Sequence, residues 1–357
     1  MFVSEDENGV RVLLTSHEQA TRLQEVGTKF RCPACRGPVI IKNGVQLPAH
    51  FAHKHNACLA SEPESGEHLR GKLLLAKIGQ TSGWNAELEV YVPEIKQRID
   101  VLLTRGEERV ALEFQCSPIS VSSLFARTQG YRQMGIGVRW ILGQRYRTLG
   151  AATKFVRLDA TGQLTTEHLD VQAGVLSRRV GVHTQSYTEY STWPHVGPQR
   201  HLGRYPDMVH EANGVGTALH YQSRKIVQLQ NICYVRGQNL AGCPWAVHAQ
   251  CTDLPGFAIP EWAARVYWLI NFWGQNVELA ANANFWRTVM APKKLPLVDW
   301  PRYLRQIEAQ FCNVLVTAGV LSATKTGWMW LRTPKWYDGL DSKIAALHSA
   351  GGDWRKA

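Results

Sequence analysis

Two acidic residues in apolar surroundings carry the chemistry that this sequence suggests. Asp100 lies in the segment QRIDVLL, and Glu113 lies in VALEFQCS. An acid buried in an apolar strand is costly unless something binds it. Two such acids on adjacent strands therefore predict a pocket for a divalent metal. Carboxylate and carbonyl oxygens suit Mg²⁺ or Mn²⁺, and either ion can activate water and stabilise charge on a phosphate.

The elements around these acids follow from local patterns. Ser65 is a suitable N-cap for a helix, and Val90 and Val92 alternate with polar neighbours as in a half-buried strand. Turn residues separate the strand-like segments. The predicted elements are a helix at 64–80, strands at 84–92, 98–103 and 110–115, a helix at about 120–134, and a strand at 137–143.

This order of elements, with Asp100 on the second strand and Glu113-Phe114-Gln115 on the third, resembles the restriction-endonuclease-like nuclease core. In that family the motif is an aspartate followed by Glu-x-Lys, and here Gln115 stands where the lysine usually does. Glutamine can hold a water molecule but brings no charge. Lys72 or Arg98 could supply the missing cation from a neighbouring element.

A narrower resemblance rests on six sequence blocks within residues 1–150. They are CPAC, HFAHK, ESGEH, QRIDVLL, EFQCSPIS and RTQGYRQMGIGVRWILG. Together they resemble the competence protein CoiA family, which is associated with natural transformation. The family implies a nuclease-like core behind a small metal-binding element. Beyond residue 150, only GCPWAVH at 242–248 is similar.

The length of 357 residues allows two or more domains. We expect an N-terminal segment at 1–62 with a zinc-ribbon-like element. An α/β restriction-endonuclease-like core of order αβββαβ should follow at 63–150. Residues 151–357 should form a mixed and then mainly helical C-terminal domain, which is rich in tryptophan.

The CPAC block predicts a structural zinc site. Cys32 and Cys35 can hold one ion from a tight turn, and four downstream residues could complete a tetrahedron. The sequence leaves open which two of them bind: the candidates are His50, His53, His55 and Cys58. The alternative, a redox dithiol, would need a thioredoxin-like setting that the sequence lacks.

The predicted helix at 64–80 offers further candidates for the metal pocket. Glu64, His68 and Lys72 are spaced four apart and share one face, and Glu67 lies one residue from that face. The resemblance to nuclease folds implies that Glu64 or Glu67 contributes to the metal site. The alternative is an exposed polar face with an ordinary Glu–Lys pair.

Four other residues could serve the site. Arg127 and Tyr131, four apart on the second helix, could reach a DNA backbone; otherwise they are a surface arginine and a half-buried tyrosine. Glu87 and Glu89 share a face of the first strand, and the alternative is that this face is solvated.

Composition bears on partners and compartment. The net charge is +11 and both halves of the chain are basic, which suits DNA, single-stranded or branched, although a solvated cationic surface would look the same. Eight cysteines are too few for a disulfide scaffold. We find no leader-like N-terminus, and the most apolar stretch, 262–273, is too short to span a membrane. We therefore expect a cytoplasmic protein.

The C-terminal part is less informative. Residues 259–290 and 300–320 predict amphipathic helices, with a tryptophan-containing stripe that more plausibly forms a core than a ligand surface. Residues 320–333 predict a hairpin after a helix, as in a winged-helix element. Its Trp and Arg side chains could stack on single-stranded bases, but a core role is favoured.

Four further cysteine and histidine residues could form a second metal site. They are Cys233, Cys243, His248 and Cys251. Because their spacing matches no familiar pattern, the sequence favours unrelated buried thiols.

Two functions remain open. The first is a metal-dependent DNA nuclease in DNA uptake, competence or recombination. The second is a catalytically weak DNA-binding scaffold that assists a recombinase. A cation near Gln115 would distinguish them. A third possibility, a zinc-ribbon regulator, leaves Asp100 and Glu113 unexplained.

Overall fold

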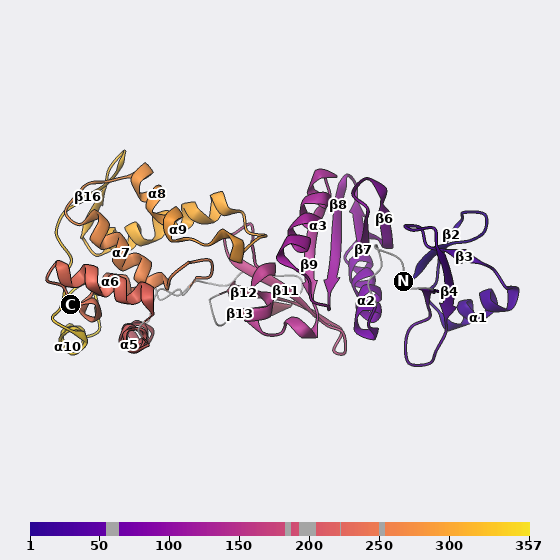
Figure 1. Cartoon of the computed structure of the whole chain (residues 1–357), viewed down its shortest axis with the longest axis horizontal. Coiled ribbons are helices and arrows are strands. Elements are labelled where there is room, and N and C mark those ends of the chain that lie inside the picture. Colours follow the sequence, from indigo (N-terminus) through magenta and orange to yellow (C-terminus); the bar gives the residue numbers. More distant parts are fainter. Residues whose placement is uncertain (55–63, 183–186, 193–204, 222, 250–253) are drawn as a thin grey trace. The chain divides into compact units, whose positions relative to one another are not determined.

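The structure is a computed structural model of the chain, and it describes residues 1–54, 64–182, 187–192, 205–221, 223–249 and 254–357 (Figure 1). His55, Cys58 and Cys251 lie outside the described residues. The chain forms two compact units, the first made mainly of residues 1–156 and 165–180, the second mainly of residues 197–357. Each unit is described by itself.

The first unit begins with a five-stranded antiparallel sheet of order β2-β1-β3-β4-β5. The strands are β1 (Val3–Glu5), β2 (Arg11–Leu13), β3 (Phe30–Arg31), β4 (Pro38–Lys42) and β5 (His50–His53). Helix α1 (His17–Val26) begins at Ser16, whose side chain accepts the amide of Gln19. The predicted small ribbon is thus part of a larger sheet with its own apolar core around Phe30 and Phe51.

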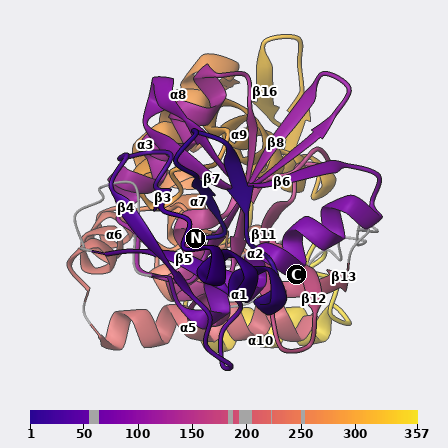
Figure 2. The ribbon, with the colours of Figure 1, turned by 90° about the vertical axis from the view of Figure 1, so that its right-hand side faces the viewer.

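The predicted order of one helix, three strands, a helix and a strand is confirmed in the rest of the unit. It consists of α2 (Gly66–Thr81), β6 (Asn85–Val92), β7 (Gln97–Arg105), β8 (Glu108–Gln115), α3 (Val121–Gln133) and β9 (Gly137–Leu142). Strands β6, β7 and β8 pair antiparallel and lie side by side in Figure 2, whereas β9 runs parallel to β8. Ser65 caps α2 as predicted, accepting the amide of His68.

Helices α2 and α3 cover opposite faces of this sheet (Figure 1). Leu69 and Leu75 of α2 pack with Leu112 and Phe114. On the other face, Tyr131 of α3 packs in a separate apolar cluster that includes strand residues of β7 and β8. Side chains that alternate along β8 therefore reach one helix or the other.

The sheet continues beyond residue 150, where the sequence predicted the core to end. After α4 (Leu149–Ala152) and β10 (Arg157–Leu158), β11 (Leu164–Asp170) joins β9 in parallel, followed by β12 (Val175–Val182) and β13 (Tyr187–Thr192). Strand β11 gave no apolar alternation because its buried positions include Thr165, Thr166, Glu167 and His168.

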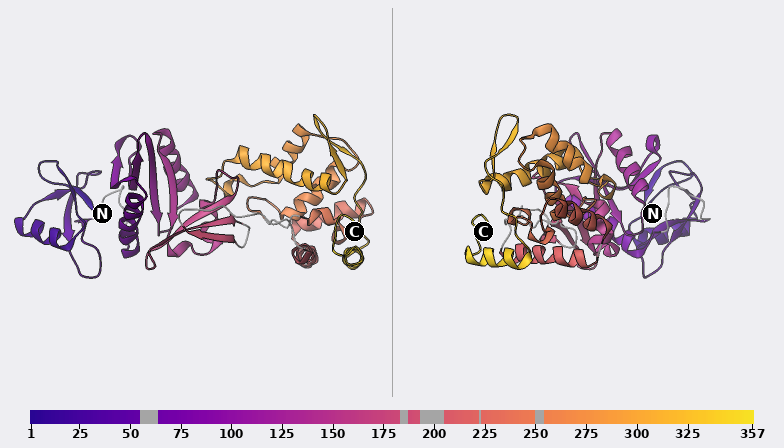
Figure 3. Two further views of the ribbon diagram at one scale, coloured as in Figure 1. Left: turned by 180° about the vertical axis from the view of Figure 1, so that it is seen from behind. Right: turned by 60° about the vertical axis from the view of Figure 1, so that its left-hand side comes forward.

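The second unit is mainly helical, as predicted. Its elements are α5 (Tyr205–His220), α6 (Arg224–Val235), α7 (Glu261–Phe272), β14 (Val277–Glu278), α8 (Leu279–Val289), α9 (Trp300–Thr317), β15 (Leu321–Ala323), β16 (Gly327–Trp330) and α10 (Leu340–Ser349). Helices α7 to α9 and the yellow hairpin gather together in Figure 3. The helical run predicted at 259–290 is interrupted after Phe272, because Gly274 adopts a left-handed conformation with φ 69°.

The hairpin predicted at 320–333 is present as β15 and β16, with β14 pairing on the other side of β16. Trp262, Val266 and Ile270 are buried, in line with the core role that the sequence favoured. None of the helices in the described parts of the chain combines the length and apolar character that crossing a membrane requires.

Candidate active site and cysteine–histidine centre

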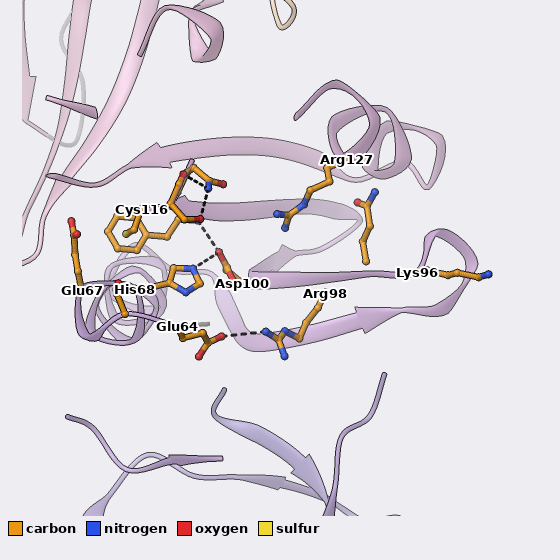
Figure 4. A pocket seen from close by; sticks show the side chains of 13 residues that line it. Glu64, Glu67, His68, Lys96, Arg98, Asp100, Cys116 and Arg127 are labelled. Atoms are coloured by element: carbon orange, nitrogen blue, oxygen red, sulfur yellow. Dashed lines mark hydrogen bonds and ion pairs between the residues drawn. The ribbon is translucent and has the colours of Figure 1, made fainter. Parts of the chain in front are cut away.

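A pocket of about 450 Å³ opens where the N-terminus of α2 meets β7, the end of β8 and α3 (Figure 4). Its lining is mostly polar and charged, and it includes five of the seven predicted catalytic residues, Asp100 among them. The lining residues are Glu64, Ser65, Glu67, His68, Lys96, Gln97, Arg98, Asp100, Phe114, Gln115, Cys116, Ser117 and Arg127.

Asp100 reaches this pocket because the β6–β7 ribbon is distorted at its position. The two strands pair regularly on both sides, but the Glu89–Asp100 pair is missing from the ladder, and Glu89 has a left-handed φ of 53°. Side chains of the flanking pairs belong to clusters on opposite faces of the sheet, those of Leu88 and Val101 on the α2 side and those of Val90 and Ile99 on the α3 side. A left-handed non-glycine residue costs on the order of 1–3 kcal/mol and commonly marks a functional site.

The Asp100 carboxylate is held by two donors. Its Oδ2 accepts the Phe114 amide at 2.9 Å and lies 3.2 Å from Nε2 of His68. Burial alone would raise the pKa of Asp100, but the His68 imidazole beside it overcomes this and holds that pKa below its usual range. In turn Asp100 raises the pKa of His68 against the effect of burial. Asp100 is therefore ionised and oriented at the edge of the pocket.

Glu113 is held on the α3 side of the sheet. Its Oε1 accepts the Tyr131 hydroxyl at 2.5 Å, and its Oε2 pairs with the Arg127 guanidinium. Burial, together with the nearby charge of Asp100, raises the pKa of Glu113 to about 7 although Arg127 opposes this. Glu113 is buried and is not among the described residues that line the pocket, although its partner Arg127 is.

Gln115 lines the pocket, but its amide is already engaged. Nε2 donates to the backbone oxygen of Ser117 at 2.8 Å and to its hydroxyl at 3.1 Å. The side chain therefore helps to order the segment after β8. It does not supply the charge that the usual lysine would bring.

Lys72 does not supply that charge either. It is fully buried, pairs with Glu64 at 2.7 Å, and also pairs with Glu89. Glu89 in addition accepts the amides of Phe2 and Val3 at 2.7 and 3.1 Å, which attaches β1 to the core. Lys72 is thus part of a closed ion cluster, and it is not among the described residues that line the pocket.

Three cations do line the pocket. Arg98 pairs with Glu64 at 3.2 Å, and Arg127 pairs with Glu113. Lys96 is exposed on the turn between β6 and β7, and its side chain extends away from Asp100 in Figure 4. Sequence reasoning missed Lys96; the turn residues Pro93-Glu94 predicted at this place were the available signal.

The remaining predicted residues have mixed outcomes. Glu67 lines the pocket, and its Oε1 accepts the Gln144 amide at 2.7 Å. Glu87 is partly exposed and pairs with Arg11, unlike the buried Glu89, because the ribbon distortion separates their faces.

Two residues on the other side of the motif also have clear positions. Tyr131 of α3 is buried and donates to Glu113, so it is not positioned to contact DNA. Cys116, which was not predicted, lines the pocket directly after the EFQ motif.

A second centre lies in the N-terminal sheet. Ligand atoms of Cys32, Cys35 and His53 all lie within 4.8 Å of one another, and the Cys35 Sγ–His53 Nε2 distance is 3.4 Å. His50 is three residues before His53 on β5, so its side chain lies on the other face, with Nδ1 2.8 Å from the Pro48 oxygen. Of the four downstream candidates, His53 joins the two cysteines.

These two sites differ in what they can hold. The thiol and imidazole donors of the N-terminal centre suit zinc. Within the described residues this is the single group of three or more metal-binding side chains, and none forms around Asp100. Asp100 lines the pocket and Glu113 is buried close enough to feel its charge, and each carboxylate is bound to protein partners. Their oxygens suit Mg²⁺ or Mn²⁺.

Comparison with known proteins finds two family models that match parts of the first 175 residues. Residues 14–61 match the family model of the competence protein CoiA N-terminal domain, and residues 64–175 match that of the competence protein CoiA nuclease-like domain. Competence protein CoiA of Bacillus subtilis (strain 168) is 39% identical over 132 residues, which are 36% of this chain and 35% of that protein.

The chain thus aligns with only about a third of the length of this curated relative. No solved structure matches it. The two matched regions carry the CPAC, ESGEH, QRIDVLL and EFQC blocks, and it is in these regions that the chain is similar to the competence protein CoiA family.

Proposed function

We propose that the protein is a metal-dependent DNA nuclease that hydrolyses phosphodiester bonds during DNA uptake, competence or recombination. The observation that carries the proposal is Asp100, an ionised carboxylate held at the edge of a polar pocket by a distorted strand pair. A buried charge and a left-handed Glu89 both cost stability, and a functional role for Asp100 accounts for both.

The donor set of the pocket fits Mg²⁺ or Mn²⁺. The hydrogen bonds that the described residues make to Asp100 go to Oδ2, which leaves Oδ1 for a cation. Glu113 would be the second residue to hold the cation, with its carboxylate released from Arg127. A bound cation would supply an activated water and positive charge against the phosphate. His68 and the Phe114 amide keep Asp100 oriented throughout.

DNA is the substrate that the charges favour. Arg98, Arg127 and Lys96 line the pocket, and the chain carries a net charge of +11. Arg127, released from Glu113, would contact the phosphate in place of the lysine that the motif lacks. Single-stranded or branched DNA suits the proposed role beside recombination proteins. Cys32 and Cys35 form no disulfide and are proposed below as metal ligands, which suits the reducing cytoplasm.

The test is incubation of labelled single-stranded, duplex and branched DNA with the protein and Mg²⁺ or Mn²⁺. Cleavage should require the cation and should disappear in Asp100→Ala and in Glu113→Ala. Glu87→Gln is the matched control, because Glu87 is an acid of the same strand ribbon that pairs with Arg11 outside the pocket. Cleavage by Asp100→Ala at the wild-type rate would remove this residue from the site.

A second function, a DNA-binding scaffold with little turnover, is favoured by one observation. Glu113 and Gln115, the two polar residues of the motif, both have protein partners. In that case Asp100→Ala should leave transformation or recombination in cells near normal, whereas the nuclease function predicts its loss. DNA binding without cleavage under every cation condition would decide for the scaffold.

We propose that the N-terminal centre binds one structural zinc ion through Cys32, Cys35 and His53. Such a site contributes folding free energy directly. Cys32→Ser or Cys35→Ser should therefore release about one zinc per chain, measured by elemental analysis, and destabilise the N-terminal sheet. Wild-type protein that is folded but contains no zinc at this centre would defeat the idea.

A further inference from the structure

Three tryptophans of the second unit lie side by side without being fully buried. The centroid of the Trp273 ring is 5.9 Å from that of Trp330 and 5.9 Å from that of Trp336. Trp273 follows α7, Trp330 ends β16, and Trp336 precedes α10. All three are half-buried, whereas Trp268 and Trp286 in the core of the same unit are fully buried. We call the three half-buried rings the tryptophan platform.

Trp330 is not fixed by a hydrogen bond of its indole nitrogen. The core residue Trp268 donates to the side-chain oxygen of Asn282 at 2.7 Å, and Trp336 donates to the Asn239 backbone oxygen at 2.6 Å. The Nε1 atom of Trp330 is buried, and none of the described residues accepts its hydrogen. Buried donors are normally paired. This ring is therefore held by packing alone, which suits a surface that adjusts to a stacking ligand.

The chain around two of these rings is basic and contains no acidic residue. Between Glu308 and Asp338 the sequence has no Asp or Glu, but it has Lys325, Arg332 and Lys335. The structure leaves all three cations exposed. Positive charge beside accessible aromatic rings complements a polyanion that also carries flat apolar groups. The charge therefore indicates what kind of partner covers the platform.

Two arginines are fixed close to the platform by backbone carbonyls. Arg236, which follows α6, donates to the Ile270 oxygen at 2.9 Å, three residues before Trp273. Arg332, in the segment after β16, donates to the Ala318 oxygen at 2.8 Å. These contacts orient the guanidinium groups without neutralising them. Both arginines therefore keep their positive charge beside the rings.

Rings and cations in this combination are typical of proteins that hold single-stranded nucleic acid. Unpaired bases stack on aromatic side chains, while Lys and Arg contact the phosphates. In a duplex the bases are already stacked on one another, so their faces are not available to the protein. The sequence favoured a core role for the tryptophans of this region, but half-burial leaves part of each ring accessible.

We propose that the tryptophan platform, with Arg236, Arg332 and Lys335, binds single-stranded DNA by stacking on unpaired bases. The platform belongs to the second unit, whereas the Asp100 pocket belongs to the first. The inference rests on the proposed function only in taking DNA as the partner, and it does not require cleavage. It gives the tryptophan-rich unit a role in selecting single strands.

The test measures binding of labelled oligothymidylate to the full-length chain without added Mg²⁺ or Mn²⁺. The wild-type protein should bind this strand more tightly than its duplex with oligoadenylate, and binding should quench tryptophan fluorescence. Trp336→Ala should weaken binding by about 5- to 150-fold, as expected for the loss of one stacked base. Trp336→Phe should restore most of the affinity, because it keeps an aromatic ring.

The matched control is Trp84→Ala, which removes a half-buried tryptophan of the first unit. Trp84 has an arginine of its own, since the Arg105 guanidinium lies 4.2 Å from the ring centroid. This variant should bind the single strand like the wild type. It therefore separates a specific effect of the platform from the general effect of losing a tryptophan beside an arginine.

The salt dependence tests the cations. Lys335→Gln should reduce the slope of log affinity against log salt by about 0.7, because one phosphate contact of a single strand is lost. Lys293→Gln is the control: this exposed lysine belongs to the short helix η6 (Pro292–Lys294), which contacts Phe257 ahead of α7. Its slope should not change. These two exposed lysines keep the test decisive if Trp336→Ala fails to fold.

Equal affinity for single strand and duplex, equal binding by Trp336→Ala and Trp84→Ala, or an unchanged slope in Lys335→Gln would overturn the proposal. Self-association of the protein without any oligonucleotide binding would overturn it as well, and would assign the platform to a contact between copies. Cleavage is measured separately with added cation. Platform-dependent binding without cleavage contradicts the nuclease alone, and cleavage without a Trp336-dependent preference contradicts the platform alone.

Discussion

Helix α2 contributes to two groups of charged residues, one of which is closed to solvent while the other lines a pocket. On one side Lys72 joins Glu64 and Glu89 in an ion cluster closed to solvent. On the other, His68 orients Asp100 at the edge of an open pocket. The sequence assigned Lys72 and His68 to one functional face because they lie four residues apart.

The difference shows that exposure, more than residue type, separates a structural from a chemical role. Breaking a buried pair leaves an uncompensated charge and costs stability. A charge at the edge of a pocket can change partners when a ligand arrives, and there altered pKa values tend to mark function. Glu64 belongs to both groups, since it pairs with Lys72 and with Arg98 of the pocket.

The largest effect should come from the closed cluster. Lys72→Met should lower the free energy of unfolding by about 3–5 kcal/mol, because Glu89 stays buried without its partner. Chemical denaturation measures this. Lys77→Met, an exposed lysine of the same helix, is the control and should change little. A loss below about 1 kcal/mol in Lys72→Met would mean that the cluster is open to water.

The open pocket should show the reverse pattern. Asp100→Asn should reduce metal-dependent cleavage by about 100-fold or more while unfolding at nearly the wild-type denaturant concentration, because a ligand is lost but no buried charge is stranded. Cleavage rates and denaturation curves of one preparation give both values. Equal losses of stability in Asp100→Asn and Lys72→Met would erase the distinction between the two groups.

The pH dependence should reflect Glu113. Its pKa is raised to about 7, so the carboxylate must lose its proton near neutral pH before it can bind a cation. Cleavage should therefore rise about tenfold per pH unit below 7 and level off above it.

Stability should move the opposite way. A folded-state pKa above the ordinary value of 4.5 means that the contribution of Glu113 to stability is lost as pH rises through about 7. Glu113→Gln should gain stability relative to wild type over that range, measured by denaturation at several pH values. A cleavage profile that is flat between pH 6 and 8 would exclude Glu113 as the titrating ligand.

The smallest effect should come from Lys96, the exposed residue that lines the pocket from the turn between β6 and β7. Lys96→Gln should weaken DNA binding a few-fold and reduce the slope of log affinity against log salt by about one, because one phosphate contact is lost. Titrations from low to high salt test this, with exposed Lys77→Gln as the control. An unchanged slope would place the DNA path away from this turn.

Local patterns were sufficient for the elements. The Ser65 cap, the alternation in β6 and the turns between strands predicted α2 to β9 in the observed order. They failed for β11, whose buried residues are polar, and at Gly274, which ends α7 inside an apolar run. In both places tertiary packing outweighs the local signal.

By itself the sequence determined the resemblance to the CoiA family, the two acids and the cysteine pair, because these depend on residue types at short spacing. Only the tertiary structure decided which histidine joins Cys32 and Cys35, that Lys72 is enclosed with Glu89, and that α3 holds Glu113 through Arg127. These three contacts depend on residues brought together from distant segments. They also depend on a strand distortion at Glu89 that no local sequence pattern indicates. Burial then sets the charge and the accessibility of each group.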